Sequence, residues 1–195
     1  GGTGIHSTPD GEVPKVIQAE GGYRSGMCLM NSGEVYHWGY GGHGQSGDAS
    51  TSTRYYPAHV GGSYQNVYLA ANTNDHVWRD TRIKRICHSG KGSEPNTHSC
   101  YAIDENGELW SWGYNGYGQL GKNTTTNGSP ETIPHKIDKA SYFNGNTIEG
   151  VWADGQEYTA VYAVDSTGKL YSWGYNGYGQ LGLGGTAAGT NQYVP

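Results

Sequence analysis

Three glycine-rich stretches have the spacing that binds dinucleotides in other folds. The segments at 36–47, 111–121 and 171–182 read YHWGYGGHGQSG, SWGYNGYGQLG and YSWGYNGYGQLG, and each contains G-x-G-x-x-G. In a dinucleotide site this pattern follows a parallel strand and opens a helix whose N-terminus faces the pyrophosphate. The residues that follow here, DASTSTRYYP, KNTTTNGSP and LGGTAAG, cannot form an amphipathic helix. We therefore expect tight loops whose glycines adopt positive φ, and no dinucleotide.

The second stretch also comes close to a phosphate-binding loop. Residues 116–122 read GYGQLGK, but Asn123 stands where the motif needs Ser or Thr, and nothing helical follows to complete the phosphate cradle. The third copy has Leu183 at the position of Lys122. We expect neither a nucleotide nor any other cofactor.

Two histidines and two cysteines lie close together in the sequence. Cys87 and His88, with His98 and Cys100, form a ligand set that zinc accepts. Adjacent residues on a strand point to opposite faces, however, so the geometry is unfavourable and we expect no metal. Cys87 and Cys100 also flank the polar segment HSGKGSEPNTHS, which leaves a disulfide in an extracellular chain and a pair of buried thiols as alternatives.

Composition excludes several function classes. The formal net charge is −5, and only 12 Lys and Arg residues are spread along 195 positions, so a nucleic-acid partner is not expected. No apolar run approaches the roughly 20 residues that cross a bilayer, so we expect no membrane insertion. The sequence has no G-x-S-x-G and no H-E-x-x-H, and its carboxylates fall mostly in predicted turns. We expect a protein that is not an enzyme.

The elements that position these loops form an internal repeat. Trp38, Trp112 and Trp173 each precede a glycine and end the segments MCLMNSGEVYHW, YAIDENGELWSW and YAVDSTGKLYSW. Each segment reads as an apolar strand, a turn at a glycine and an alternating strand, which is a β-hairpin. The 34 glycines and 17 tyrosines, against a single Phe, fit an all-β fold with many tight turns.

An earlier strand and an opening proline complete each unit. The segments IQAEG (17–21), ICHSG (86–90) and VWADG (151–155) precede the hairpins, and Pro14, Pro57 and Pro134 lie upstream of them. A period of this length is typical of repeat architectures. We place repeats at about 14–56, 57–133 and 134–194, with 1–13 as the tail of a preceding repeat.

The pattern G-x-L-Y-S-W-G-x-N-x-x-G-Q-L-G, at 107–121 and 168–182, resembles the repeat of the regulator of chromosome condensation family. Gly41 and Ser46 depart from the motif Asn and Leu in the first copy. The resemblance implies a β-propeller with four-stranded antiparallel blades, commonly seven in a ring, of which this chain is a three-blade segment.

The resemblance and the packing of such blades assign structural roles to the motif residues. We expect the tryptophans to be buried between blades, the asparagines to occupy left-handed turn positions, and the leucines to anchor each loop. The residues are Trp38, Trp112, Trp173, Asn115, Asn176, Gln119, Gln180, Leu120 and Leu181.

Two insertions differ between the repeats and are the predicted binding site. They span 61–82 and 138–147, and their aromatic and basic side chains have the composition of recognition surfaces, although local packing against the propeller edge is the alternative. The expected contact residues are Tyr64, Tyr68, His76, Trp78, Arg79, Tyr142 and Phe143.

The Gly, Tyr, Asn, Thr and Ser content favours an extracellular or virion-surface module, such as part of a phage tail fibre or an adhesin. Its expected partner is another protein or a subunit of the same assembly, with a surface glycan stacked on the rings as the alternative. Two other functions remain open. One is an intracellular guanine-nucleotide exchange factor, as the best-known family members are, and the other is a secreted enzyme inhibitor.

Overall fold

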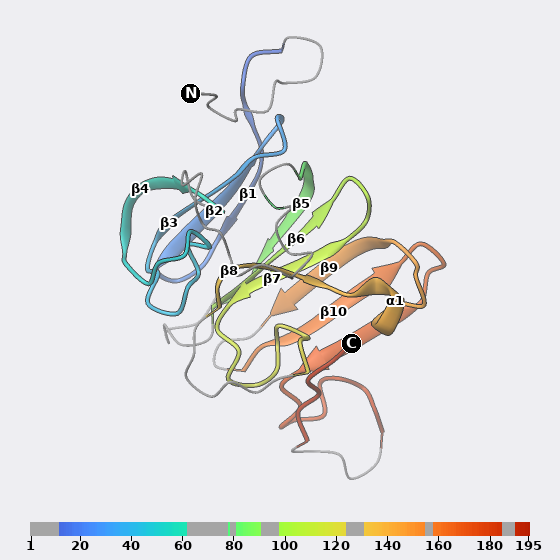
Figure 1. Cartoon of the computed structure of the whole chain (residues 1–195). Coiled ribbons are helices and arrows are strands. Elements are labelled where there is room, and N and C mark those ends of the chain that lie inside the picture. Colours follow the sequence, from blue (N-terminus) through green and yellow to red (C-terminus); the bar gives the residue numbers. More distant parts are fainter. Residues whose placement is uncertain are drawn as a thin grey trace, which may run out of the picture.

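Eleven strands and one helical turn make up the described part of this computed structural model, which covers residues 12–61, 78, 81–90, 98–123, 131–154, 158–184 and 190–195. The strands form three antiparallel sheets that follow one another through the molecule (Figure 1). The first sheet contains β1 (Val16–Gly21), β2 (Ser25–Met30), β3 (Val35–Gly39) and β4 (Arg54–His59). The second contains β5 (Ile83–His88), β6 (Ser99–Asp104), β7 (Leu109–Gly113) and β8 (Glu131–Ile137). The third contains β9 (Ile148–Asp154), β10 (Ala160–Asp165) and β11 (Leu170–Gly174).

The predicted hairpins join the second and third strands of each sheet. Gly33, Gly107 and Gly168 turn these hairpins with φ of 86°, 70° and 85°. In the third sheet the Asp165 carboxylate accepts hydrogen bonds from the backbone N–H groups of Thr167 and Lys169 at 2.9 and 3.0 Å. Asp104 accepts the equivalent bonds in the second sheet, which explains why an acidic residue opens each of these two turns.

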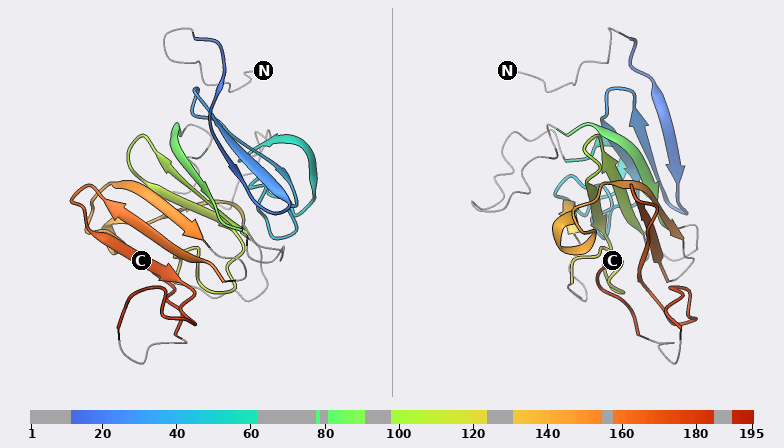
Figure 2. Two further views of the ribbon diagram at one scale, coloured as in Figure 1. Left: turned by 180° about the vertical axis from the view of Figure 1, so that it is seen from behind. Right: turned by 90° about the vertical axis from the view of Figure 1, so that its right-hand side faces the viewer.

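The first strands of the three sheets converge. Contacts between sheets run from β1 to β5 and from β5 to β9, which places these strands on the inner side of the arc that the sheets form (Figure 2). Each sheet is therefore a blade, and the all-β propeller architecture is confirmed. The repeat limits drawn at Pro57 and Pro134 fall inside β4 and β8, so repeats and blades begin at different strands, and the limits stay a prediction.

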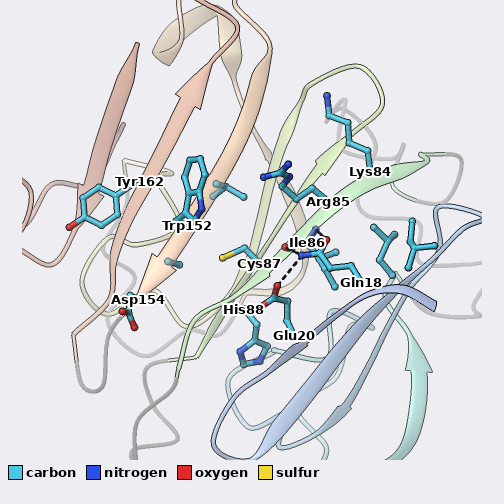
Figure 3. A pocket seen from close by; sticks show the side chains of 14 residues that line it. Gln18, Glu20, Lys84, Arg85, Ile86, Cys87, His88, Trp152, Asp154 and Tyr162 are labelled. Carbon is cyan, nitrogen blue, oxygen red and sulfur yellow. Dashed lines mark hydrogen bonds between the residues drawn. The ribbon is translucent and has the colours of Figure 1, made fainter. Parts of the chain in front are cut away.

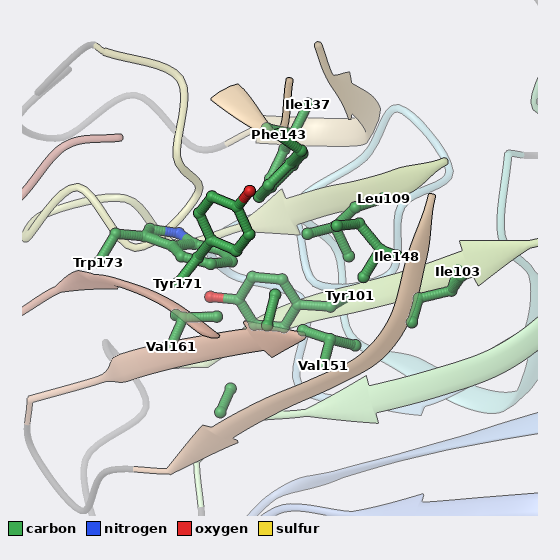
Figure 4. Close-up of a cluster of buried hydrophobic side chains, with 12 residues drawn as sticks. Tyr101, Ile103, Leu109, Ile137, Phe143, Ile148, Val151, Val161, Tyr171 and Trp173 are labelled. Carbon is green, nitrogen blue, oxygen red and sulfur yellow. The ribbon is translucent and has the colours of Figure 1, made fainter. Parts of the chain in front are cut away.

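The hydrophobic core lies between the blades, because successive residues of a strand face opposite neighbours. Trp110 and Trp112 of β7 face the first blade, where they pack with Leu29 and Val35. Leu109 of β7 faces the third blade instead. There it joins a second cluster, shown in Figure 4: Tyr101, Ile103, Ile137, Phe143, Ile148, Val151, Val161, Tyr171 and Trp173.

Two blade faces have no neighbour in the described part of the chain. Val35 and Leu109 are buried by the following blade, whereas Leu170, at the same register position of the third blade, is 62% exposed. At the other end, Trp38 is only half-buried, although Trp112 and Trp173 are fully buried. The prediction that all three tryptophans are buried is therefore wrong for Trp38, because no described blade covers its side.

The described residues form one α-helical turn, α1 (Lys139–Tyr142), capped by Asp138, whose carboxylate accepts from the Ala140 N–H at 3.0 Å. Within the described ranges, the chain contains no helix with the length and apolar character of a membrane span.

Candidate functional site: an aromatic track on the loop face

Strand direction places all three glycine loops on one face of the blades. In each sheet the third strand runs parallel to the first, because both are antiparallel to the second. The loops that follow β3, β7 and β11 therefore emerge on the same side as the connections from first to second strand. We call this side the loop face. β4 and β8, the fourth strands that precede the insertions, run the other way and end at the opposite face.

Side chains of the repeat motif hold each loop in shape. The Asn115 side-chain oxygen accepts from the Leu120 N–H at 2.9 Å, and Asn176 accepts from Leu181 at 3.1 Å. Gln119 accepts from the Tyr117 N–H, and Gln180 from the Tyr178 N–H, both at 2.9 Å.

Neither asparagine has the positive φ that the sequence suggested; among the described non-glycine residues only Ala49, Asn123 and Asn144 do. The asparagines at 115 and 176 are thus fixed in place by their hydrogen bonds and not by a left-handed turn.

The first and second loops are also tied to the next blade by a tryptophan. Trp112 of the second blade donates its indole N–H to the Gln45 carbonyl at 2.9 Å, and Trp173 of the third donates to the Gln119 carbonyl at 2.8 Å. The Tyr101 hydroxyl adds a 2.9 Å bond to the same Gln119 carbonyl. These buried bonds make the loops parts of a rigid scaffold, on which a binding surface can be preorganised.

Six aromatic side chains occupy the first and third of the three positions that the motif W-G-x-N-x-x-G leaves free in each copy. They are Tyr40 and His43 in the first loop, Tyr114 and Tyr117 in the second, and Tyr175 and Tyr178 in the third. Each pair is in ring contact within its loop, with centroids 6.1 to 6.2 Å apart.

Ring contacts continue from one blade to the next. His43 meets Tyr114 edge-on at 5.2 Å, and Tyr117 meets Tyr175 edge-on at 5.2 Å. Tyr158, from the connection between β9 and β10, stacks on Tyr175 at 4.1 Å. The seven rings form one unbroken row across three blades, which we call the aromatic track.

The first glycine of each loop is required by the track itself. At Gly116 a Cβ atom would lie 2.0 Å from the Tyr114 hydroxyl oxygen, and the same contact recurs at Gly42 with Tyr40 and at Gly177 with Tyr175. The phenol lies directly over the glycine backbone. The next glycine, Gly118, has φ +78° and serves the turn. Packing and turn geometry therefore account for the G-x-G-x-x-G spacing.

The track presents half-buried rings, and Tyr178 at its end is 83% exposed. Burial raises the pKa of Tyr114, so its phenol stays neutral and can donate a hydrogen bond at physiological pH. Arg24 lies 5.4 Å from the centroid of the Tyr23 ring on the same face. Rigid aromatic rings with polar tips, beside an arginine, are the side chains enriched at protein interfaces.

A groove of about 670 Å³ runs along the inner strands (Figure 3). Gln18 spans it, donating to the Ile86 carbonyl at 2.7 Å and accepting from the Ile86 N–H at 3.0 Å. Lys84 and Asp154 are among the charged residues of its wall. The groove therefore carries side chains of opposite charge beside the inner strands. The Gln18 hydrogen bonds join β1 to β5, so they stabilise the packing of the first blade against the second.

Three of the predicted contact residues, Trp78, Tyr142 and Phe143, lie in the described part of the chain. None of them is an exposed anchor. Trp78 is buried, donates to the Val60 carbonyl at 2.9 Å, and packs edge-on against Trp112 at 5.4 Å. Phe143 is fully buried 4.9 Å from Tyr171, and Tyr142 packs partly against the same cluster. These rings fill space between blades, which is the local-packing alternative. Tyr64, Tyr68, His76 and Arg79 lie outside the described residues.

Three histidines near the loop face are buried at the boundary between the first two blades. Burial lowers the pKa of His37 to about 4 and of His88 to about 3, and it also lowers the pKa of His98. All three imidazoles are therefore neutral at physiological pH. The cysteines Cys28, Cys87 and Cys100 form no disulfide bond with one another.

Comparison with known proteins gives the family. A model of the regulator of chromosome condensation (RCC1) repeat matches residues 106–161 and 167–195. The ultraviolet-B receptor UVR8 of Arabidopsis thaliana is 29% identical over 94% of this chain and 37% of its own length. A mouse secretion-regulating guanine nucleotide exchange factor is 30% identical over 86% of this chain and 31% of its own.

Solved structures agree with this assignment. Human WBSCR16 aligns with a TM-score of 0.66 at 20% identity, covering 93% of this chain and 37% of its own. Prp20p of Saccharomyces cerevisiae aligns with a TM-score of 0.62 at 19% identity, covering 92% of this chain and 37% of its own. The chain belongs to the RCC1-type β-propeller family. It spans about a third of the length of these relatives.

Membership of the RCC1-type family contradicts the predicted location and function of the chain. The relatives are intracellular regulatory proteins of eukaryotes, and none of those named is a tail fibre or an adhesin. The prediction of an extracellular or virion-surface module is therefore wrong. The Gly- and Tyr-rich composition behind it is explained by the RCC1-type loops, which use both residues in every blade. No comparison supports a glycan or a subunit of the same assembly as partner.

The aromatic track is the surface that sequence reasoning missed. Repeated residues were all attributed to packing, and only the insertions were considered for binding. The available signal was that two of the three free positions of the motif hold an aromatic side chain in all three copies. Turn geometry at those positions does not require one.

Proposed function

We propose that this chain is part of a non-catalytic, intracellular RCC1-type propeller that regulates another protein by binding it through the loop face. Guanine-nucleotide exchange on a bound partner is the form of regulation that the relatives favour. One of them is named as a guanine nucleotide exchange factor, and the yeast structure is described together with binding of Prp20p to Gsp1p and histones. The observation that carries the proposal is the aromatic track.

The track suits a protein partner because its rings are already ordered. Ring contacts between loops and the bonds from Trp112 and Trp173 hold the track in the free protein, so binding orders few additional side chains. Tyrosine buries a large area with only two rotatable side-chain bonds. Exchange also needs no covalent chemistry from the propeller, because it proceeds by binding that favours one conformation of the partner.

A matched pair of tyrosine substitutions tests the proposal. Tyr178→Ala removes the exposed end of the track, whereas Tyr55→Ala removes a tyrosine of β4 that is 87% exposed and is not one of the seven rings of the track. Partners would be recovered by cross-linking to the purified chain in a eukaryotic cell extract and identified by mass spectrometry. Affinity for each purified partner would then be measured, together with its rate of release of a fluorescent guanine nucleotide where it binds one.

We expect Tyr178→Ala to weaken binding about tenfold, the effect of losing 1.4 kcal/mol at an interface. Tyr55→Ala should leave the affinity unchanged. Equal affinities for the parent and Tyr178→Ala, with both folded by circular dichroism, would rule out the track as the docking surface. Binding without nucleotide release would retain the binding role and reject the exchange role.

A further inference from the structure

A cluster of metal-binding side chains lies between the first and second blades. His37 comes from β3, His88 from β5 and Cys100 from β6, and all three are buried. One ligand atom from each lies within 4.8 Å of the others. The set includes a residue from a different blade, which is why its spacing in the sequence gives no sign of it.

Three of the four imidazole nitrogens of this cluster lack partners in the described part of the chain. Both ring nitrogens of His37 and Nδ1 of His88 are buried without a hydrogen bond. The two ring nitrogens of His98 are in the same condition, with its ring centroid 5.6 Å from that of His88. Buried polar atoms are nearly always satisfied, and an orphaned group requires a specific explanation such as a bound ion.

The cluster also departs from the repeat at every one of its positions. Cross-strand register aligns His37 with Ser111 and Ser172. The same register aligns His88 with Gly21 and Ala153, and Cys100 with Gly26 and Val161. The other two blades therefore hold hydroxyl, small or apolar residues where this interface holds three ligands. Packing of the repeat explains those residues and does not explain His37, His88 and Cys100.

The donor set identifies the class of ion. Two imidazoles and a thiolate suit Zn²⁺, which takes tetrahedral nitrogen and sulfur ligands. His88 Nε2 lies 3.0 Å from the Ser25 hydroxyl, which leaves Nδ1 for the ion and resembles the outer hydrogen bond that orients most ligating histidines. The Cys100 sulfur makes a long contact of 3.7 Å to the Gln45 carbonyl.

We propose that His37, His88 and Cys100 bind a Zn²⁺ ion that joins the first blade to the second. A tetrahedral ion with ordinary bond lengths places its ligand atoms about 3.5 Å apart, so small side-chain rotations must draw the three together. Binding releases the Cys100 thiol proton to solvent.

The sequence had led us to expect no metal, because Cys87 and His88 point to opposite faces. That objection holds for Cys87, which packs toward the third blade. It does not apply to the set proposed here, since Cys87 is replaced by His37 from the neighbouring blade.

Cobalt binding to the full chain tests the site. The purified chain would be reduced, stripped with a chelator and titrated with Co²⁺, which occupies zinc sites and is coloured. We expect one Co²⁺ per chain, with the visible bands of a tetrahedral ion and a thiolate-to-cobalt charge-transfer band. Added Zn²⁺ should remove both signals and raise the melting temperature above that of the stripped chain.

The repeat itself supplies conservative variants and a control. His37→Ser, His88→Ala and Cys100→Val each install the residue that the third blade holds at the same position. Cys28→Ala is the matched control, because the other two blades have Ala102 and Ala163 there. Each cluster variant should weaken Co²⁺ binding at least tenfold, and Cys100→Val should abolish the charge-transfer band. Cys28→Ala should titrate like the parent.

Three results would overturn the proposal. They are a parent chain that shows no tetrahedral cobalt spectrum, a charge-transfer band that survives in Cys100→Val, and a band that is lost in Cys28→Ala. Circular dichroism of each stripped variant checks that it folds. The three cluster substitutions test the site independently, so failure of one to fold leaves the other two decisive.

Discussion

Replacing Trp112 and Trp38 by alanine compares the same motif position with and without a covering blade. Trp112 is fully buried, donates to the Gln45 carbonyl at 2.9 Å and packs edge-on against Trp78 at 5.4 Å. Removing a buried tryptophan costs about 3–5 kcal/mol, since the cavity collapses only partly. In a chain of this size each kcal/mol lowers the melting temperature by about 2–4 °C, so Trp112→Ala should melt about 6–20 °C below the parent.

Trp38→Ala should have a much smaller effect. The Trp38 ring is half-buried, so its removal opens little closed cavity, and we expect a loss of about 1–2 kcal/mol. Differential scanning calorimetry measures both variants without relying on tryptophan fluorescence, which the substitutions themselves change. Equal losses of melting temperature in the two variants would refute the argument, because the cost would then not follow burial between blades.

Two further predictions concern charge and backbone. A hydrogen bond from His135 holds the pKa of Glu131 at about 2, below its ordinary value, so this carboxylate contributes stability above about pH 4.5 that is lost as the pH falls toward 2. Glu131→Gln should therefore reduce the fall in melting temperature over that range, and an unchanged pH profile would contradict the assignment. Gly118 and Gly179 have φ of +78° and +75°, but a Cβ on Gly118 would lie 2.2 Å from Tyr193, whereas nothing lies within 4 Å at Gly179. Gly179→Ala should lower the free energy of unfolding by about 1–2 kcal/mol because of its positive φ alone, and Gly118→Ala should lower it by more. Urea unfolding measures both losses. Equal losses would contradict the argument, because they would mean that Tyr193 moves aside freely.

The repeat made the blades predictable, because its signals are local. A glycine turn between two apolar strands defines each hairpin, and the tryptophan that ends the hairpin recurs in all three units. The burial of Trp112 and Trp173 follows from that pattern. The exposure of Trp38 could not be predicted, since it depends on whether a blade lies beside the first sheet.

Contacts between blades were not predictable from the sequence, because they join residues that no local pattern relates. Phe143 and Trp78 lie in polar, glycine-containing segments that read as exposed loops, yet both rings enter the core. His37 meets His88 only because β3 of one blade faces β5 and β6 of the next. The aromatic track has the same origin, since His43 and Tyr114 become neighbours only when the blades are side by side.

The bonds that tie the first and second loops to the following blade form in a fixed order during synthesis. The Gln45 carbonyl cannot accept its bond until Trp112, 67 residues further along the chain, has been synthesised. The Gln119 carbonyl likewise depends on Trp173, 54 residues further. A ribosome adds about 5–20 residues per second, so each loop spends several seconds outside the exit tunnel before its tryptophan arrives. The loop face is therefore completed from the N-terminal side, one blade behind synthesis, and a chain that stops before Trp173 leaves the second loop without that bond.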